Sequence, residues 1–373
     1  MNEHPVYRVA VFGIRSIPPR PGSAGADTSA TEYYTRFVER GHKVTCYNRV
    51  YKSDTELLSE YKGIKLVNMK TINVAGFDSL YHSFKATFHI IFKNTADIVE
   101  IGNGGNSIWA LFLRMFGKKV FVFQDGVDWM REKWPWYGKL FLYFSAYLTA
   151  KLPNRVIFDN VYAKELFEKK FNKKFDLNTY GSEIRDFVES DEICHKLGLT
   201  PGEYFLFVGR FIPDKGLHYL IPAFEKLKTD KKLVLVGGSP NPSEYEIMIK
   251  STKDPRIIFP GYIYGNDTMN LMKHSYLYIQ PSDIEGLSPV ILQVMGIGAP
   301  LLCSDIKENI FVVGDTALTF KQSDTDSLYE KLIYSLEHPA ELKKLAQLAN
   351  VRVHQNFSWD TVINEHLKLI ANT

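Results

Sequence analysis

The chain has 373 residues, which is more than one ordinary hydrophobic core organises and fits two domains of typical size. With 45% hydrophobic and 23% charged residues it has the composition of a globular protein, and a net charge of +3 is too small to indicate a nucleic-acid partner. Aromatic residues are frequent at 14%, which leaves room for exposed apolar surface.

Targeting signals and cysteine usage bear on the compartment. The first residues are polar, so we expect no signal peptide. No apolar run reaches the roughly 18 to 20 residues of a membrane span, since Leu140–Leu152 is too short and contains Lys151. The three cysteines are widely separated and predict reduced core thiols. We therefore predict a cytoplasmic protein, with peripheral contact at the inner face of the membrane left open.

Short apolar or β-branched runs alternate with helical patterns in the first half, which is typical of parallel α/β sheets. The predicted strands are Tyr7–Gly13, Lys43–Tyr47, Lys65–Met69, Asp97–Ile101, Lys119–Gln124 and Arg155–Phe158. The predicted helices are Ser29–Arg40, Leu80–Phe92, Ser107–Phe116, Tyr137–Lys151 and Val161–Phe171.

The same alternation restarts in the second half. The predicted strands are Tyr204–Gly209, Lys232–Gly237, Arg256–Phe259, Leu277–Gln280 and Pro300–Ser304. The predicted helices are Leu217–Leu227, Ser243–Ser251, Asn266–His274 and Pro289–Gly296, followed without intervening strands by Asp324–Glu337, Ala340–Gln355 and Thr361–Ile370.

A polar, charged stretch from Thr179 to Gly202, with one short helical piece, is the predicted connection between domains. The fold class is α/β with two doubly wound domains, 1–180 and 181–355, and a C-terminal helix in 356–373 that crosses back to the first. Two such domains facing each other bring the carboxyl ends of both sheets to a central cleft, where ligands bind.

Two cations follow the first strand of the second domain. Arg210 and Lys215 come directly after Gly209 and flank a helix start. Arginine offers a planar fork and lysine a mobile point charge, and two cations at this spacing suit a diphosphate. The alternative is a solvated loop with two surface charges.

The segment Asp283–Asp305 predicts an anion site. Ser288 occupies an N-cap position and Pro289 the first helical position, so backbone N–H groups point forward unsatisfied. Glu285 lies just before this helix start, and Gln293 lies on the helix. Gln293 alone could also be a buried helix residue without a ligand.

Glycines follow the next two strands, at Gly237-Gly238-Ser239 and Gly261-Tyr262-Ile263. Glycine lets the backbone approach a ligand closely, although ordinary turns would also use it here.

The first strand of the chain enters a Gly/Pro-rich loop, Ile14–Thr28, which includes Arg15, Gly22 and Gly25. Its glycine spacing is not a dinucleotide fingerprint and no acidic residue closes the second strand, which argues against NAD. We expect a flexible lid on the cleft.

Two further loops follow strands of the first domain. One contains Asn103 and Asn106, and the other contains Asp125 and Asp128. The aspartates could position an acceptor or form an N-cap and salt-bridge cluster.

Aromatic and basic side chains lie further along the first domain. Trp129, Trp134 and Trp136 could stack on a sugar or close the core. The basic run Lys164–Lys174 could rest on anionic lipid or form a solvated helix face.

These motifs resemble retaining GT-B glycosyltransferases of family four. The Glu285 segment resembles the signature Glu-x7-Glu, with Gln293 in place of the second Glu, and Arg210 with Lys215 matches the diphosphate clamp. The first-domain loops resemble a bacterial subgroup that builds surface polysaccharide and includes rhamnosyltransferases. This chain departs from that subgroup after Gly22, where a second glycine and an acidic residue are usual, and at Asp128, where Glu is usual.

The resemblance implies a GT-B fold of two Rossmann-like domains and specific roles for the matching residues. Glu285 would hold donor-sugar hydroxyls, and Gln293 would grip the ribose without charge assistance, a loss of about 1 kcal/mol. Asp125 or Asp128 would replace a histidine that many relatives use near the anomeric carbon. The backbone positions implied to contact or flank the nucleotide and its phosphates are Gly209, Gly237, Gly238, Ile263, Gly286, Leu287 and Ser288.

The predicted function is transfer of a sugar, with retention, from a UDP-, dTDP- or GDP-linked donor to a glycan or lipid-linked glycan acceptor. The acceptor would bind the first domain, and no metal or cofactor is expected. In the family the donor's own phosphate oxygen is thought to help deprotonate the acceptor hydroxyl. Two alternatives stay open: a catalytically weak sugar-nucleotide-binding protein and a GT-B sugar-nucleotide epimerase.

Overall fold

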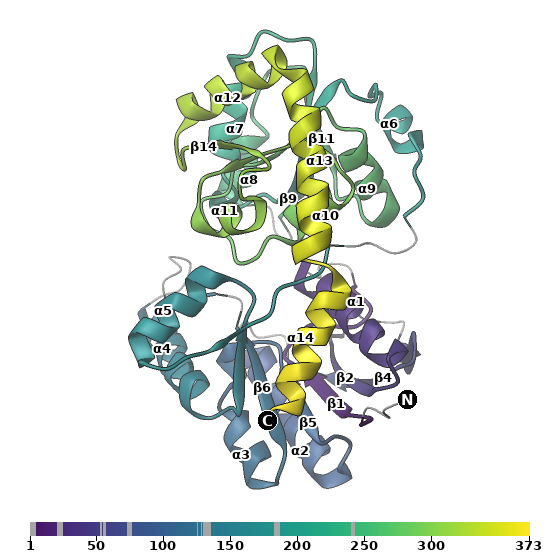
Figure 1. Ribbon diagram of the computed structural model, residues 1–373, viewed down its shortest axis with the longest axis vertical. Coiled ribbons are helices and arrows are strands. Elements are labelled where there is room, and N and C mark those ends of the chain that lie inside the picture. Colours follow the sequence, from purple (N-terminus) through teal and green to yellow (C-terminus); the bar gives the residue numbers. More distant parts are fainter. Residues whose placement is uncertain are drawn as a thin grey trace. The chain divides into compact units, whose positions relative to one another are not determined.

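The computed structural model describes residues 5–20, 25–52, 54, 57–72, 77–124, 126–127, 129, 136–182, 187–239 and 243–373. The chain divides into two compact units (Figure 1). Unit 1 is Met1–Tyr180 with Asp360–Thr373, and unit 2 is Gly181–Trp359. The last helix therefore belongs to the first unit, although it follows the second unit in sequence.

The described part of unit 1 forms an eight-stranded sheet of order β3-β4-β2-β1-β5-β6-β7-β8. Of these strands, β3 pairs antiparallel to β4 and the other pairs are parallel. Its strands are β1 (Arg8–Phe12), β2 (Lys43–Val50), β3 (Glu60–Tyr61), β4 (Ile64–Lys70), β5 (Ile98–Ile101), β6 (Lys119–Gln124), β7 (Arg155–Phe158) and β8 (Asp176–Leu177).

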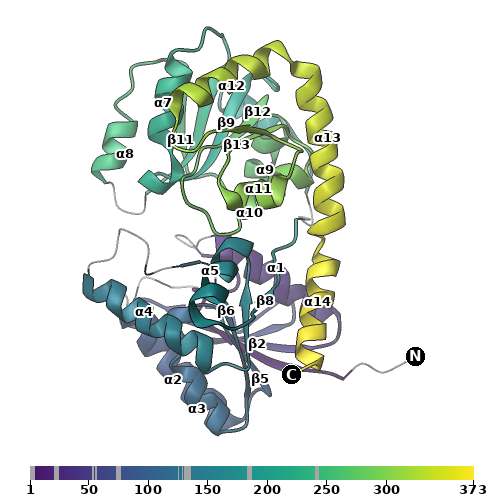
Figure 2. The same cartoon turned by 60° about the vertical axis from the view of Figure 1, so that its left-hand side comes forward.

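Helices cover both faces of this sheet (Figure 2). This follows from strand order running in both directions from β1, because crossovers of one hand then lie on opposite faces. One layer contains α2 (Phe77–Lys93), the 3-10 turn η1 (Gly104–Asn106), α3 (Trp109–Met115), α4 (Trp136–Lys151) and α5 (Val161–Phe171). The other layer contains α1 (Gly25–Glu39) and α14 (Trp359–Ala371). Strand residues alternate accordingly: Val99 and Val120 pack with α2 and α3, whereas Phe121 and Phe123 contact His366 of α14.

A buried polar cluster fixes α14 to unit 1. The Glu100 carboxylate, wholly buried on β5, is 2.7 Å from His366 Nε2 and accepts a 2.7 Å hydrogen bond from Tyr34 Oη. The rings of Phe37 and Phe123 lie 5.3 and 5.7 Å from the His366 ring. Both oxygens of the Glu100 carboxylate therefore have partners. Burying this group without partners would be costly.

A second buried histidine, His82 on α2, gives unit 1 a pH dependence. Burial, reinforced by the nearby Arg49 charge, lowers the pKa of His82 to about 3. Between about pH 6.5 and 5 the unfolded chain takes up a proton here that the folded protein does not, so stability falls on acidification. We expect this site to account for about 2 kcal/mol of the free energy of unfolding lost over that interval, at about 1.4 kcal/mol per pH unit.

Urea titrations at several pH values test this expectation with His82→Gln, which should flatten the acid limb. The exposed His195 of unit 2 is the matched control, and His195→Gln should leave the slope unchanged. A slope equally steep in His82→Gln would contradict the assignment.

The described part of unit 2 forms a six-stranded parallel sheet of order β11-β10-β9-β12-β13-β14. Its strands are β9 (Tyr204–Arg210), β10 (Lys232–Gly238), β11 (Ile257–Gly261), β12 (Leu277–Gln280), β13 (Leu301–Ser304) and β14 (Leu318–Phe320). The connections run outward in one direction from β9 to β11 and in the other from β12 to β14. The topological switch point therefore lies between β9 and β12, where ligands bind in open α/β sheets.

The unit 2 helices cover this sheet and enclose a large aromatic and aliphatic core. They are α6 (Glu192–Lys196), α7 (Leu217–Glu225), α8 (Glu244–Ile249), α9 (Gly265–Lys273), α10 (Pro289–Gly296), α11 (Lys307–Val313), α12 (Thr325–Glu337) and α13 (Pro339–Asn356), with a 3-10 turn η3 (Pro213–Lys215) after β9.

Most predicted elements are confirmed with ends shifted by a few residues, and four short ones were missed. Strands β3, β8 and β14 have two or three residues, too few to establish a period of two. Helix α11 was missed because its run Ile310-Phe311-Val312-Val313 favours a strand by propensity. All three cysteines are free and buried, as predicted. Among the described helices, none combines the length and the apolar character needed to cross a bilayer.

Candidate functional site

Two of the predicted site residues of unit 2, Lys215 and Glu285, meet at its switch point. Lys215 ends η3, the turn that follows β9, and Glu285 lies in the loop that follows β12. The Lys215 ammonium lies 2.6 Å from Glu285 Oε1, and the two side chains are only 17% and 7% exposed. The fold therefore joins two motifs that the sequence separates by 70 positions.

Hydrogen bonds from β12 hold this carboxylate in place. Gln280 Nε2 donates to Glu285 Oε1 over 2.6 Å, and Tyr278 Oη donates to Gln280 Oε1 over 2.8 Å. Gln280 and Tyr278 were not predicted as site residues. A polar residue that ends a buried apolar strand at the carboxyl edge was the available signal for Gln280.

The charge environment keeps Glu285 ionised. Burial raises its pKa, but the Lys215 charge and hydrogen bonds from Lys215, Ser282 and Gln280 outweigh burial and leave the pKa below its usual value. Glu308, in the first turn of α11, shows the opposite shift, because burial and then the Glu285 charge raise its pKa. The two carboxylates therefore differ in proton affinity.

Gly216 allows the loop to turn into this position. It adopts a left-handed conformation at φ +68°, and a Cβ there would lie 1.9 Å from the Pro281 carbonyl oxygen. Only glycine fits both the dihedral angle and the close approach of the two loops.

The predicted N-cap of α10 is confirmed. Ser288 is extended, at φ −78° and ψ 106°, and its hydroxyl accepts from Ile291 N, with Pro289 at the first position of the helix. Leu287 and Ser288 are buried, and Gly286 is half-buried. Gln293 is half-buried, and its side-chain amide forms no hydrogen bond with any described residue.

Arg210 and the ends of β10 and β11 form the other side of the carboxyl edge. Arg210 is exposed, pairs in register with Gly238, and makes no ion pair with a described residue. The Tyr262 ring lies close to Gly238, since a Cβ built on Gly238 would be 3.2 Å from Tyr262 Cε2. The exposed Tyr262 ring also stacks with the Tyr264 ring, with 5.9 Å between the ring centres. The Ile263 carbonyl already accepts from Thr268 Oγ1 over 2.6 Å.

A close backbone contact explains one of the glycines at this edge. Gly237 has φ +132°, and a Cβ there would lie 1.8 Å from the Gly209 carbonyl oxygen. The two strand ends therefore approach more closely than any side chain permits.

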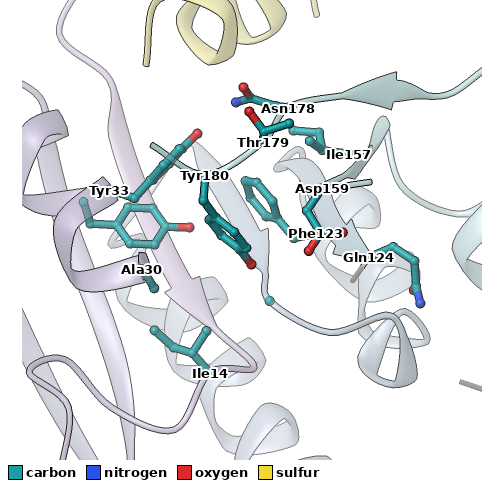
Figure 3. Close-up of a pocket in the computed structure, with 12 residues that line it drawn as sticks. Ile14, Ala30, Tyr33, Phe123, Gln124, Ile157, Asp159, Asn178, Thr179 and Tyr180 are labelled. Atoms are coloured by element: carbon teal, nitrogen blue, oxygen red, sulfur yellow. The ribbon is translucent and has the colours of Figure 1, made fainter. Parts of the chain in front are cut away.

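Unit 1 has a pocket of its own at the carboxyl edge of its sheet (Figure 3). Figure 3 shows Tyr180 near its middle, with Tyr33 on one side and Asp159 on the other. Asp159 follows β7, is 7% exposed, and accepts from Asn160 Nδ2 over 3.0 Å. Phe123 and Gln124, at the end of β6, also line the pocket. Asp159 was not predicted, although a carboxylate directly after a buried strand was a usable signal.

The predicted lid and acceptor residues are spread over unit 1. The Arg15 guanidinium lies 5.5 Å from the centre of the Tyr51 ring, and Gly25 is the first residue of α1. Asn103 caps η1 by accepting from Gly105 N over 2.7 Å. Asn106 is 2% exposed and donates to Ser79 Oγ over 3.1 Å, so it links η1 to α2. Gly22, Asp125 and Asp128 lie outside the described residues.

The predicted tryptophans have different surroundings. Trp129 packs 5.1 Å from Phe167 against a core cluster, whereas Trp136 is 77% exposed and Trp134 lies outside the described residues. In the basic run, Glu168 pairs with both Lys164 and Lys174. Part of that run is thus a paired helix face.

Three comparisons relate this chain to known proteins. The family model for glycosyl transferases group 1 matches residues 190–352, which contain Arg210, Lys215, Glu285 and Gln293. Sucrose-phosphate synthase from Thermosynechococcus elongatus superposes with a TM-score of 0.83, 17% identity and 98% coverage of both chains. The chain has the GT-B fold. Another GT-B structure, Anabaena Alr3699/HepE in complex with UDP-glucose, superposes with a TM-score of 0.80, 15% identity and coverage of 98% of this chain and 100% of that one.

The curated relatives are similar over part of their length. The chain is 26% identical over 174 residues to O-antigen chain mannosyltransferase B of Escherichia coli, covering 45% of each protein. It is 28% identical over 197 residues to D-rhamnosyltransferase WbpZ of Pseudomonas aeruginosa, covering 51% of each. The matched region thus spans about half the length of these relatives. Within the described residues, no group of three or more His, Cys, Asp or Glu side chains is placed to hold a metal ion.

Proposed function

We propose that this GT-B protein is a retaining glycosyltransferase that moves a sugar from a nucleoside diphosphate sugar to a glycan or lipid-linked glycan in surface polysaccharide synthesis. The observation that carries the proposal is the contact of Lys215 with Glu285 at the switch point of unit 2, within the segment that matches group 1. The names of the curated relatives, a mannosyltransferase and a rhamnosyltransferase, support a hexose or deoxyhexose donor.

The donor diphosphate would bind where positive charge and N–H groups are already placed. Lys215 contacts Glu285, and the N-terminus of α10 follows Glu285 in the sequence. Arg210, exposed at the end of β9, is available for an anion. As the bond to the anomeric carbon breaks, negative charge develops on the departing diphosphate. Groups fixed before the reaction stabilise that charge without reorganising. These residues would supply the positive charge that a metal ion supplies in metal-dependent glycosyltransferases, so we expect a chelator to leave the rate unchanged.

Glu285 would orient the donor sugar. Its lowered pKa keeps the carboxylate ionised at neutral pH, and an ionised carboxylate accepts strong hydrogen bonds from sugar hydroxyls. Gln280 and Lys215 limit its rotation through their contacts with Oε1. A donor phosphate oxygen would deprotonate the acceptor hydroxyl on the same face of the sugar, which gives retention.

Two further features suit the remaining parts of the substrates. The exposed Tyr262 ring beside Gly238 offers a stacking surface for the nucleotide base. The unit 1 pocket combines aromatic rings with Asp159 and Gln124, a lining suited to sugar rings and their hydroxyls, and we assign the acceptor to it.

The decisive experiment incubates the protein with UDP-, dTDP- and GDP-sugars, with and without glycan acceptors, and measures released diphosphate and the product linkage. Acceptor-dependent release with retained anomeric configuration, read by NMR, is expected. Binding of nucleotide sugar without turnover over a broad acceptor panel would favour the alternative function, a catalytically weak sugar-nucleotide-binding protein, which the substitution at Gln293 leaves open. Conversion of the free donor would favour an epimerase.

Arg210→Ala is expected to lower kcat/KM for the donor about 10-fold or more, since a charged hydrogen bond contributes about 1.5–3 kcal/mol. Lys196 is an exposed cation of the same unit, paired with Glu192 on α6, so Lys196→Ala is the matched control and should leave donor use unchanged. Full activity in Arg210→Ala would remove Arg210 from the diphosphate site.

Gln293→Glu is expected to tighten donor binding about fivefold, the equivalent of about 1 kcal/mol of charge assistance to a ribose hydroxyl. Titration calorimetry with the nucleotide diphosphate measures this change. An unchanged or weaker affinity would mean that Gln293 does not contact the ribose.

A further inference from the structure

Helix α4 of unit 1 is built with its large apolar side chains outside. The residues it buries are small or polar, namely Ser145, Ala146, Thr149 and Ala150. Its exposed side chains are large and mostly aromatic, with Trp136 77%, Leu140 62% and Phe144 53% exposed. A surface helix of a globular protein normally shows the reverse distribution.

Helix α2 has the same inverted pattern. It buries His82, Ser83, Ala86, Thr87 and Ile90 against the sheet layer. Its outer side exposes Phe77, Tyr81, Phe84 and Phe92, at 64%, 43%, 44% and 76%. Between α2 and α4, helix α3 and its C-terminal end expose Leu111, Met115 and Phe116.

These three outer sides form one surface, which we call the aromatic face. Helices α2, α3 and α4 lie side by side on the same side of the sheet (Figure 2). The Phe84 and Trp109 rings are 5.5 Å apart across α2 and α3, and Arg114 of α3 donates to the Leu152 carbonyl after α4 over 2.7 Å. Exposed apolar surface of this extent marks an interaction site rather than scattered surface residues.

The charge of the aromatic face indicates the chemistry of its partner. Within 77–93, 108–116 and 136–151 there is one acidic side chain, Asp78, and it pairs with Arg49. The basic side chains in the same described ranges are Lys85, Lys93, Arg114, Lys139 and Lys151. The exposed aromatic side chains favour a partner with an apolar interior, and the surrounding basic side chains favour a partner with an anionic surface.

We propose that the aromatic face docks unit 1 on the surface of a bilayer that contains anionic lipids. Tryptophan, tyrosine and phenylalanine would enter the boundary between headgroups and acyl chains, while lysines extend to the lipid phosphates. A second copy of this chain is a poorer partner, because two-fold pairing of the face with itself sets like charges opposite each other. The inference stands on unit 1 alone and does not depend on the proposed donor site.

Vesicle binding tests the proposal on the full chain. Sedimentation with phosphatidylcholine vesicles, with and without phosphatidylglycerol, should give salt-sensitive binding only when the anionic lipid is present. The double variant Phe141→Ser/Phe144→Ser should weaken that binding about 10-fold or more. Phe141 and Phe144, both on the exposed side of α4, are 44% and 53% exposed, so the double variant should keep its fold, and thermal unfolding checks this.

The matched control removes exposed apolar side chains elsewhere. Ile247→Ser/Met248→Ser changes two residues of α8 that are 65% and 51% exposed, and should bind vesicles like the parent. Absence of binding to anionic vesicles overturns the proposal, as does binding unaffected by the aromatic-face variant. Sedimentation velocity showing a dimer that Phe141→Ser/Phe144→Ser dissociates, without vesicle binding, would assign the face to a second copy instead.

Discussion

Replacing Lys215 with methionine is expected to lower the rate of sugar transfer by about 10²- to 10³-fold, the usual effect of removing one preorganised group that stabilises developing charge. Lys215 is the cation nearest Glu285, at 2.6 Å, and methionine keeps the length of the side chain without its charge. Initial rates under donor saturation measure the effect on kcat, and nucleotide titration measures binding separately.

The same change should also reduce stability, which separates two causes of lost activity. Without Lys215, the buried Glu285 carboxylate loses its ion pair, and its pKa should rise. The double variant Lys215→Met/Glu285→Gln removes both charges, and should recover stability but not activity. Lys231→Met is the matched control. Lys231 also forms an ion pair, with 2.7 Å between its Nζ and Glu203 Oε2, but this pair does not lie at the switch point. Normal transfer by Lys215→Met would show that the diphosphate binds elsewhere.

Replacing Glu100 with alanine is expected to lower the stability of unit 1 by about 3–5 kcal/mol, the usual cost of removing one partner from a buried hydrogen-bonded pair of ionisable groups. Tyr34 Oη and His366 Nε2 would both lose their acceptor inside a core from which water is excluded. Urea unfolding gives the total loss, and hydrogen exchange of β5 and α14 amides locates it in unit 1.

Glu365→Ala, on helix α14 next to His366, is the control for Glu100→Ala. Glu365 is 53% exposed and pairs with Lys368, so its removal should change stability by less than about 0.5 kcal/mol. Equal stabilities of Glu100→Ala and Glu365→Ala would mean that the buried cluster does not hold α14 in place.

The sequence predicted local features of the site well, because their signals are local. Ser288 and Pro289 specify a helix start through capping and a fixed φ angle, and the structure has that start. The ends of β6, β7 and β12 were placed without error, since apolar runs there stop at polar residues. These predictions needed no knowledge of the fold.

Contacts between distant residues were beyond such signals. The pairing of Lys215 with Glu285 depends on β9 and β12 being neighbours, which the order of elements along the chain does not state. The frequency of aromatic residues left room for exposed apolar surface, but its location required knowing which side of α2 and α4 meets the sheet. The role of His366 likewise required knowing that α14 packs on β5 and β6.

The position of His366 has a consequence for folding during synthesis. The ribosome makes β5, with Glu100, long before it makes α14, and all of unit 2 is translated in between. Until then the Glu100 carboxylate lacks the histidine that completes its buried surroundings. Unit 2 consists of one continuous segment and can fold as it emerges. The unit whose synthesis starts first is therefore the last to be completed.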